Sequence, residues 1–173
     1  CNPNSLTIAK LNEFKKAQVN RLSIGLQTTS NKLLGQIGRL HTKKDFDLAV
    51  SRARLFGFDN LSADIILGFP NQKLADVKRT LRHLTKLKIN HISAYGLIVE
   101  GGTRLHQQLQ KGTFRLPPES LQLKMYDYTK KYLQKRGIER YEVSNFAKLG
   151  YESRHNQKYW TGGEYLGLGA VSS

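Results

Sequence analysis

The chain has 173 residues and a mass of 19.7 kDa, and its 39% hydrophobic and 24% charged residues are typical of one folded globular domain rather than a disordered chain. Lysine and arginine exceed aspartate and glutamate by 28 − 13 = +15, but the basic residues form scattered pairs such as Lys43-Lys44. No apolar run approaches the roughly 18 residues of a membrane-spanning helix, and the single cysteine, Cys1, excludes a disulfide framework or a zinc site of several thiolates. This composition favours a cytoplasmic protein without a membrane span.

Three segments with alternating side chains predict β-strands, and helical spacing separates them. The expected strands are 19–27 (VNRLSIGLQ), 61–68 (LSADIILG) and 91–97 (HISAYGL). Apolar residues recur every three or four positions over 43–56 and 73–87, and Gly57 suits the end of the earlier helix. Strands that alternate with helices in this way are typical of parallel βαβ units, so the sequence predicts an α/β fold.

The two faces of each expected strand differ in polarity. Leu22 and Ile24 belong to an apolar face, whereas the opposite face combines small and polar residues. On that second face Gln27, Asp64 and Tyr95 lie in the C-terminal halves of the three strands. A sheet covered by helices on both sides favours apolar residues on both faces. The asymmetry therefore predicts a barrel that surrounds a polar ligand at the C-terminal ends of its strands.

Beyond residue 100 the pattern changes to helices and loops. A short helix is expected over 104–110. A longer helix is expected over 118–135, and Gly137 suits the turn that terminates it. Residues 140–147 (RYEVSNFA) predict one further strand. The tail from His155 onward is aromatic and glycine-rich, a composition typical of a binding loop.

Common catalytic motifs do not occur in the sequence. It has no nucleophile elbow, Walker loop, paired-histidine metal motif or GxGxxG loop. The 5 histidines are spread too widely to indicate a metal cluster. The residue pattern alone therefore indicates no more than half of a ligand-binding α/β barrel.

Eight short stretches in a fixed order carry a more specific signal. They are NPNSLT at 2–7, VNRLSIGLQ at 19–27, IGRLH at 37–41, DIILGFPNQ at 64–72, HISAYGLIVEGGT at 91–103, YEVSNFAKLGY at 141–151, HNQKYW at 155–160 and YLGLGA at 165–170. Together they resemble, over essentially the whole chain, the oxygen-independent coproporphyrinogen III oxidase family of radical S-adenosylmethionine (SAM) proteins. The pair YEVSNFAK and HNQKYW is similar to the heme-chaperone (HemW-type) branch rather than to the true oxidases.

This resemblance implies a three-quarter (β/α) barrel of the TIM type that encloses a 4Fe-4S cluster and SAM. The family binds the cluster through a CxxxCxxC motif, which these residues do not contain, so no metal ligand is assigned here. The chain opens on Cys1 and its one methionine is Met125, so we expect a piece of a longer protein. Residues 1–100 then form the later half of the barrel. Residues 101–173 begin a C-terminal extension of helices and loops with the HNxxYW motif.

The resemblance also assigns SAM contacts to four residues. The family positions match Gln27, Arg39 and Asp64, and more loosely Ile98 near the adenine. An amide both donates and accepts hydrogen bonds, an arginine pairs with a carboxylate, and an aspartate accepts from an amine or a hydroxyl. Without the resemblance, Arg39 equally suits a surface helix and Asp64 a structural carboxylate.

His155 matches the heme-binding histidine of the HNxxYW motif in the heme-chaperone branch. With Tyr159 and Trp160 it offers an axial imidazole beside flat apolar surfaces, which heme requires. A structural histidine that bonds to the surrounding loop is the alternative.

The implied function is that of a heme chaperone, which takes up heme and delivers it to an unidentified acceptor protein. SAM, a 4Fe-4S cluster and heme are its expected cofactors, and this chain alone is not expected to be catalytic. The alternative is an oxygen-independent coproporphyrinogen III oxidase, which converts two propionates of its porphyrinogen substrate to vinyl groups. A third interpretation, a basic nucleic-acid-binding domain, has no motif in its favour.

Overall fold

A computed structural model describes residues 1–164, so the YLGLGA stretch at 165–170 lies outside the described residues. After a short 3-10 helix, η1 (Pro3–Ser5), its helices are α1 (Ile8–Lys16), α2 (Asn31–Gln36), α3 (Lys43–Leu55), α4 (Leu74–Lys86), α5 (Arg104–Gln110), α6 (Glu119–Gln134) and α7 (Arg154–Thr161). Its strands are β1 (Arg21–Gln27), β2 (Asn60–Leu67), β3 (His91–Gly96), β4 (Glu139–Arg140) and β5 (Asn145–Ala147). Within this described range no helix is long and apolar enough to cross a membrane.

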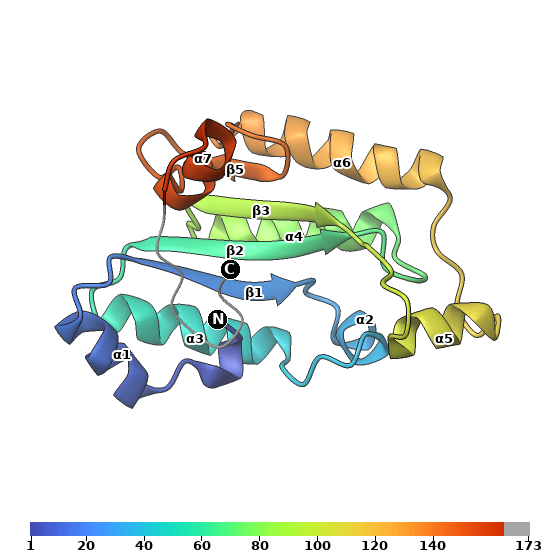
Figure 1. Cartoon of the computed structure of the whole chain (residues 1–173), viewed down its shortest axis with the longest axis horizontal. Coiled ribbons are helices and arrows are strands. Elements are labelled where there is room, and N and C mark those ends of the chain that lie inside the picture. The colour runs from blue at the N-terminus through green and yellow to red at the C-terminus, as the bar shows by residue number, and fades with distance from the viewer. Residues whose placement is uncertain (165–173) are drawn as a thin grey trace.

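The strands form one mixed sheet in the order β1-β2-β3-β5-β4 (Figure 1). β1, β2 and β3 are parallel neighbours, so the predicted βαβ units and the α/β class are confirmed. β5 pairs antiparallel with β3 and with β4. The single strand predicted over 140–147 is wrong, because a turn separates β4 from β5. In that turn the Glu142 carboxylate accepts a hydrogen bond from the Ser144 N–H at 3.1 Å.

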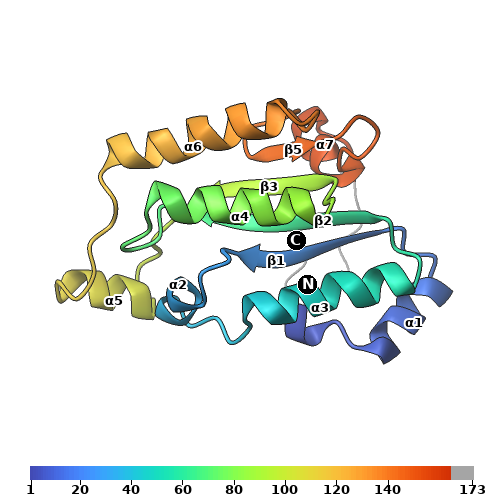
Figure 2. The same cartoon turned by 180° about the vertical axis from the view of Figure 1, so that it is seen from behind.

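Helices α3 and α4 cover one face of β1 to β3, as the opposite views of Figures 1 and 2 show. The side chains predicted to be apolar lie on that face, and Ile24, Ile65 and Ile92 are at most 1% exposed. Phe46 of α3 and Leu81 of α4 are buried in the same core cluster. Removal of this layer from water is the main source of hydrophobic stabilisation. The opposite face of the sheet carries the polar residues.

Helix α3 starts and ends at residues that suit those positions. The Thr42 hydroxyl accepts the Asp45 N–H at 3.3 Å, and the Asp45 carboxylate accepts the Thr42 N–H at 2.7 Å. This capping box satisfies two amides that the helix itself leaves unpaired. Gly57 follows the helix with φ +75°, a conformation that favours glycine.

We expect Thr42→Ala to lower the free energy of unfolding by about 1 kcal/mol, because the alanine side chain cannot accept the helix amide. Urea denaturation measures the change. Ser51→Ala is the control, since its exposed hydroxyl lies in the same helix and donates to the Asp47 carbonyl instead. Equal losses in both proteins would contradict a specific contribution from the cap.

The expectation of a loop from His155 onward is wrong for residues 155–161, which belong to α7. The Ser153 hydroxyl accepts the Asn156 N–H at 3.3 Å and caps the helix, and Gly162 follows it with φ +67°. The sequence pattern does not indicate α1 and α2, because these helices are short and bury few residues. The division of the chain at residue 100 stays a prediction.

Candidate functional site

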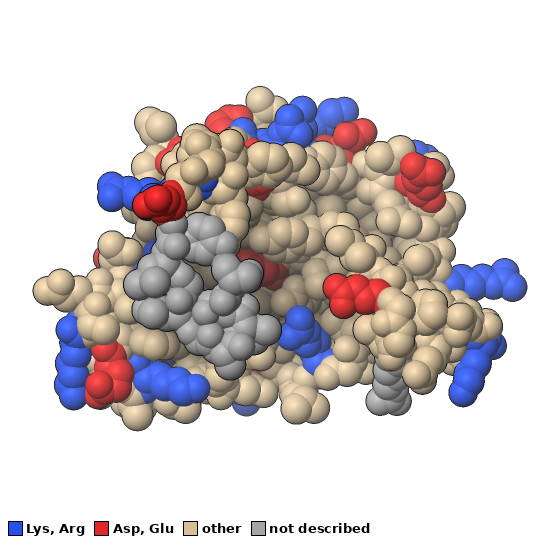
Figure 3. All heavy atoms as spheres, in the orientation of Figure 1, with Lys and Arg blue, Asp and Glu red and all other residues tan. Residues whose placement is uncertain are grey.

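The face of β1 to β3 that α3 and α4 leave uncovered is polar, and the molecule is hollowed on this side (Figure 3). Strand pairing places Arg21 beside Asn60, Ser23 beside Ser62 and His91, Gly25 beside Asp64 and Ser93, and Ile66 beside Tyr95. Paired residues of neighbouring strands point to the same side, so these residues share one face as predicted. The Tyr95 side chain is 43% exposed, which excludes a core position for it.

Gln27 is the last residue of β1, and Asp64 lies just past the middle of β2. Asp64 is half-buried, and its Oδ1 atom accepts the Ser23 hydroxyl at 2.8 Å. Gln27 is 7% exposed and has φ +64°. Its side chain folds back over Gly25, where an added Cβ would lie 2.7 Å from Gln27 Nε2. Glycine at position 25 therefore leaves room for a polar amide over the hollow face.

Arg39 and Ile98 line one cavity of ≈330 Å³ beyond the C-terminal ends of β2 and β3. Arg39 Nη1 donates to Asn2 Oδ1 at 3.2 Å, and Ile98 is 81% exposed. The structure therefore brings two of the four predicted SAM residues to one cavity. Gln27 and Asp64 are not part of its lining and lie on the strands that lead toward it.

A chain of hydrogen bonds that no local sequence pattern indicates lies at the opposite ends of the strands. Ser62 Oγ lies 2.7 Å from His91 Nδ1, and His91 Nε2 lies 2.7 Å from the Tyr141 hydroxyl. That hydroxyl accepts the Ser153 N–H before α7 at 3.2 Å. Burial, and secondarily the charge of Arg21, lowers the pKa of His91 to about 3, while burial raises the pKa of Tyr141. Both side chains are therefore neutral at pH 7 and connect the sheet to α7.

We expect the protein to lose stability as the pH falls below 6.5. His91 has a lower pKa in the folded than in the unfolded state, so between these values protons bind preferentially to the unfolded chain. The contribution of this histidine is present above pH 6.5, and about 1 kcal/mol of it is lost between pH 7 and pH 5.5. Urea denaturation at both pH values should give a smaller difference for His91→Gln than for the wild type. His106→Gln is the control, and an unchanged pH dependence in His91→Gln would contradict the assignment.

His155 is exposed on α7. Its ring meets the Tyr159 ring edge-to-face, with centroids 4.9 Å apart, as residues four apart on a helix can. Tyr159 and Trp160 are 56% and 63% exposed, so the aromatic groups of the HNxxYW motif lie on the surface. His155 shares a cavity with Arg21 and Asn60, the first residues of β1 and β2. The structure therefore places His155 at the opposite ends of the strands from the predicted SAM residues.

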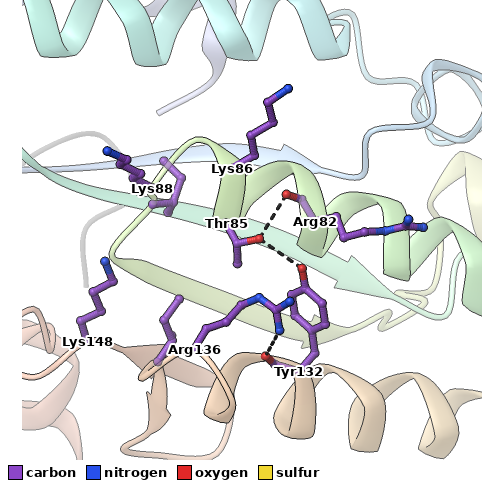
Figure 4. Close-up of a pocket in the computed structure, with 9 residues that line it drawn as sticks. Arg82, Thr85, Lys86, Lys88, Tyr132, Arg136 and Lys148 are labelled. Atoms are coloured by element: carbon purple, nitrogen blue, oxygen red, sulfur yellow. Dashed lines mark hydrogen bonds between the residues drawn. The ribbon is translucent and has the colours of Figure 1, made fainter.

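A further cavity, of ≈440 Å³, has a basic lining (Figure 4). It receives Arg82, Lys86 and Lys88 from the end of α4 and the residues beyond, and Arg136 from the segment after α6. The Arg136 guanidinium lies 3.7 Å from the centre of the Tyr132 ring. Cations at helix C-terminal ends are stabilised by the helix dipole, which explains this concentration of charge structurally. None of the predicted site residues lines this cavity.

Metal-ligating side chains do not gather within residues 1–164. No group of three or more His, Cys, Asp or Glu side chains in this range could hold a metal ion. The exposed Cys1 supplies the one thiol of the sequence. The residues of this chain therefore do not fit a 4Fe-4S cluster, which needs several thiolates.

Comparison with known proteins relates the chain to one superfamily. The profile of the Radical SAM superfamily matches residues 1–84. The chain is 43% identical over 169 residues to "Heme chaperone HemW" of Bacillus subtilis (strain 168), a match that covers 98% of this chain and 45% of the relative. It is 40% identical over 168 residues to "Radical S-adenosyl methionine domain-containing protein 1, mitochondrial" of Mus musculus, covering 97% of this chain and 38% of the relative. The chain thus spans less than half the length of these relatives.

The fold is similar to that of coproporphyrinogen III oxidase (HemN) from Escherichia coli, described as a radical SAM enzyme. The two structures superpose with a TM-score of 0.75 at 20% identity, over 93% of this chain and 36% of that one. A similar fold with a TM-score of 0.64 at 19% identity occurs in the Elp3 protein of Methanocaldococcus infernus, over 75% of this chain and 31% of that one. These superpositions confirm the predicted fold class, an α/β fold that forms part of a barrel of the TIM type.

Proposed function

We propose that this chain is part of a heme chaperone. Residues 1–84 match the radical SAM superfamily, and nearly the whole chain is similar in sequence to HemW heme chaperones. The whole protein takes up heme as cargo and delivers it to an acceptor protein in the cytoplasm. One observation carries the proposal: the HNxxYW motif forms a surface helix, on which the exposed His155 ring contacts the Tyr159 ring and Trp160 is also exposed. An exposed imidazole can reach a heme iron, and adjacent aromatic rings offer flat apolar contacts.

The proposal assigns SAM to the C-terminal ends of the strands. Asp64 accepts from an amine or a hydroxyl of SAM, Gln27 bonds to its polar groups, and Arg39 pairs with its carboxylate. Ile98 supplies apolar contact near the adenine. These donors and acceptors fit the ligand, and the hollow polar face separates it from the helical core. SAM bound to a 4Fe-4S cluster would supply radical chemistry. Alternatively, it would serve as a structural ligand of the barrel.

The cluster itself is assigned to no residue of this chain. Three thiolates of a CxxxCxxC motif are needed, and the sequence contains 1 cysteine. The proposal therefore attributes cluster binding to a part of the whole protein outside these residues, and no step is derived through the cluster here.

Heme titration of the purified protein tests the proposal. We expect a Soret band that saturates at one heme per chain, because a single HNxxYW motif provides a single axial histidine. A linear increase in absorbance without saturation, equal to that of a protein without a heme site, would contradict heme binding.

A further inference from the structure

A cavity of ≈500 Å³ lies where β1 and β2 begin, beside the start of α7. His155 lines it, together with Arg21, Asn60, Glu152 and Arg154. The volume falls within the usual range of ligand pockets. This cavity lies at the opposite ends of the strands from the predicted SAM residues, so SAM binding does not account for it.

Arg21 reaches the cavity with hydrogen-bonding capacity that the described residues do not use. Within residues 1–164 its side chain forms no ion pair or hydrogen bond, and its Nε atom is buried without a partner. Asn60 Oδ1, from the neighbouring residue of the sheet, is buried without a partner in the same way. Buried polar groups in proteins are nearly always paired. Two unpaired polar groups beside one cavity therefore indicate a polar ligand.

A carboxylate is the ligand group that fits these two side chains. A guanidinium binds a carboxylate through two parallel hydrogen bonds, and the Asn60 amide, rotated by half a turn, donates its NH₂ to the same group. Glu152 also lines this cavity, but within residues 1–164 it forms no ion pair with Arg21, and its carboxylate accepts the Gly150 N–H at 2.8 Å. With Arg21 and Arg154 positive and Glu152 negative, the lining carries one net positive charge, which favours an anion.

We infer that Arg21 and Asn60 bind a propionate of the heme whose iron His155 coordinates. The inference rests on the proposed heme binding at α7 and adds the recognition of the acidic side of the cargo. The three side chains line one cavity, so a single ligand can contact all of them. A porphyrin whose propionates are esterified then loses the contact with Arg21 and keeps the contact with His155.

Titration with heme and with heme dimethyl ester, in the same aqueous dimethyl sulfoxide, tests this inference on the full-length protein. The wild type should bind heme at least tenfold more tightly than the ester. Arg21→Met should bind heme about tenfold more weakly than the wild type and the ester with unchanged affinity, which removes the preference. Unchanged ester binding also shows that the variant is folded and that its His155 site is intact.

Arg82→Met is the matched control, because Arg82 lines the separate basic cavity and its loss lowers the net charge equally. This control should keep the full preference for heme. The inference is overturned if the wild type does not discriminate, if Arg21→Met keeps the preference, or if Arg82→Met loses it to the same extent. If Arg21→Met does not fold, Asn60→Ala replaces it, with an expected threefold loss for heme only. A wild type that binds neither ligand would refute the proposed function itself.

Discussion

Replacement of His155 by alanine should weaken heme binding by at least tenfold, on the order of 1.4 kcal/mol. An imidazole is a common axial ligand of heme iron, and His155 is the one histidine of the HNxxYW motif. It is exposed on α7, so its removal leaves no cavity in the core. Alanine also has a higher helix propensity than histidine, and the Ser153 cap remains. A loss of affinity therefore reports the lost ligand rather than an unfolded helix.

Absorbance titration at the Soret maximum measures this effect. His106→Ala is the matched control, because His106 lies on α5, outside the motif, and its replacement should leave the affinity unchanged. The Soret maximum of the remaining complex of His155→Ala should also shift, since its axial ligand differs. Equal dissociation constants for wild type and His155→Ala would remove His155 from the account.

Asp64→Asn should weaken SAM binding by at least tenfold. The substitution keeps the size of the side chain and the hydrogen bond from the Ser23 hydroxyl, but it removes the negative charge that we propose binds SAM. A hydrogen bond from a cationic amine to a neutral amide is weaker than one to a carboxylate. The loss should therefore appear in affinity and leave the stability of the fold nearly unchanged.

Equilibrium dialysis of radiolabelled SAM against the full-length protein, with its cluster assembled, measures this affinity. Asp59→Asn serves as the control, because Asp59 is exposed immediately before β2 and has the same charge. Retention of SAM by Asp64→Asn at the level of this control would contradict the assignment of Asp64.

Much of the fold is predictable from the sequence because its periodicities are strong. Apolar alternation identifies β1, β2 and β3, since one face of each strand packs under helices. Helix α7 is harder to predict, because its aromatic residues are exposed and form no apolar stripe toward the core. The cap at Ser153 and the glycine at 162 were the available signals, and they mark both ends of the helix.

The partners of the polar side chains near α7 cannot be predicted from local sequence patterns, because they come from segments far apart in the sequence. Alternation places Arg21 and His91 on the polar face, but it does not assign them partners. Tyr141 reaches His91 across 50 positions of the sequence, because β5 returns antiparallel beside β3. Asn60 lies beside Arg21 only through the register of β1 and β2. Strand pairing therefore decides which side chains line the ≈500 Å³ cavity beside α7.

The most direct test of the central claim compares porphyrin chemistry with heme retention. The full-length protein, with its cluster assembled, is incubated without oxygen with coproporphyrinogen III, SAM, a reductant and heme, and the porphyrins are separated by chromatography. A true oxygen-independent oxidase in a parallel reaction shows that the assay works. The account predicts unchanged coproporphyrinogen and one heme bound per chain. Formation of protoporphyrinogen by the protein would contradict the chaperone function and support porphyrinogen decarboxylation instead.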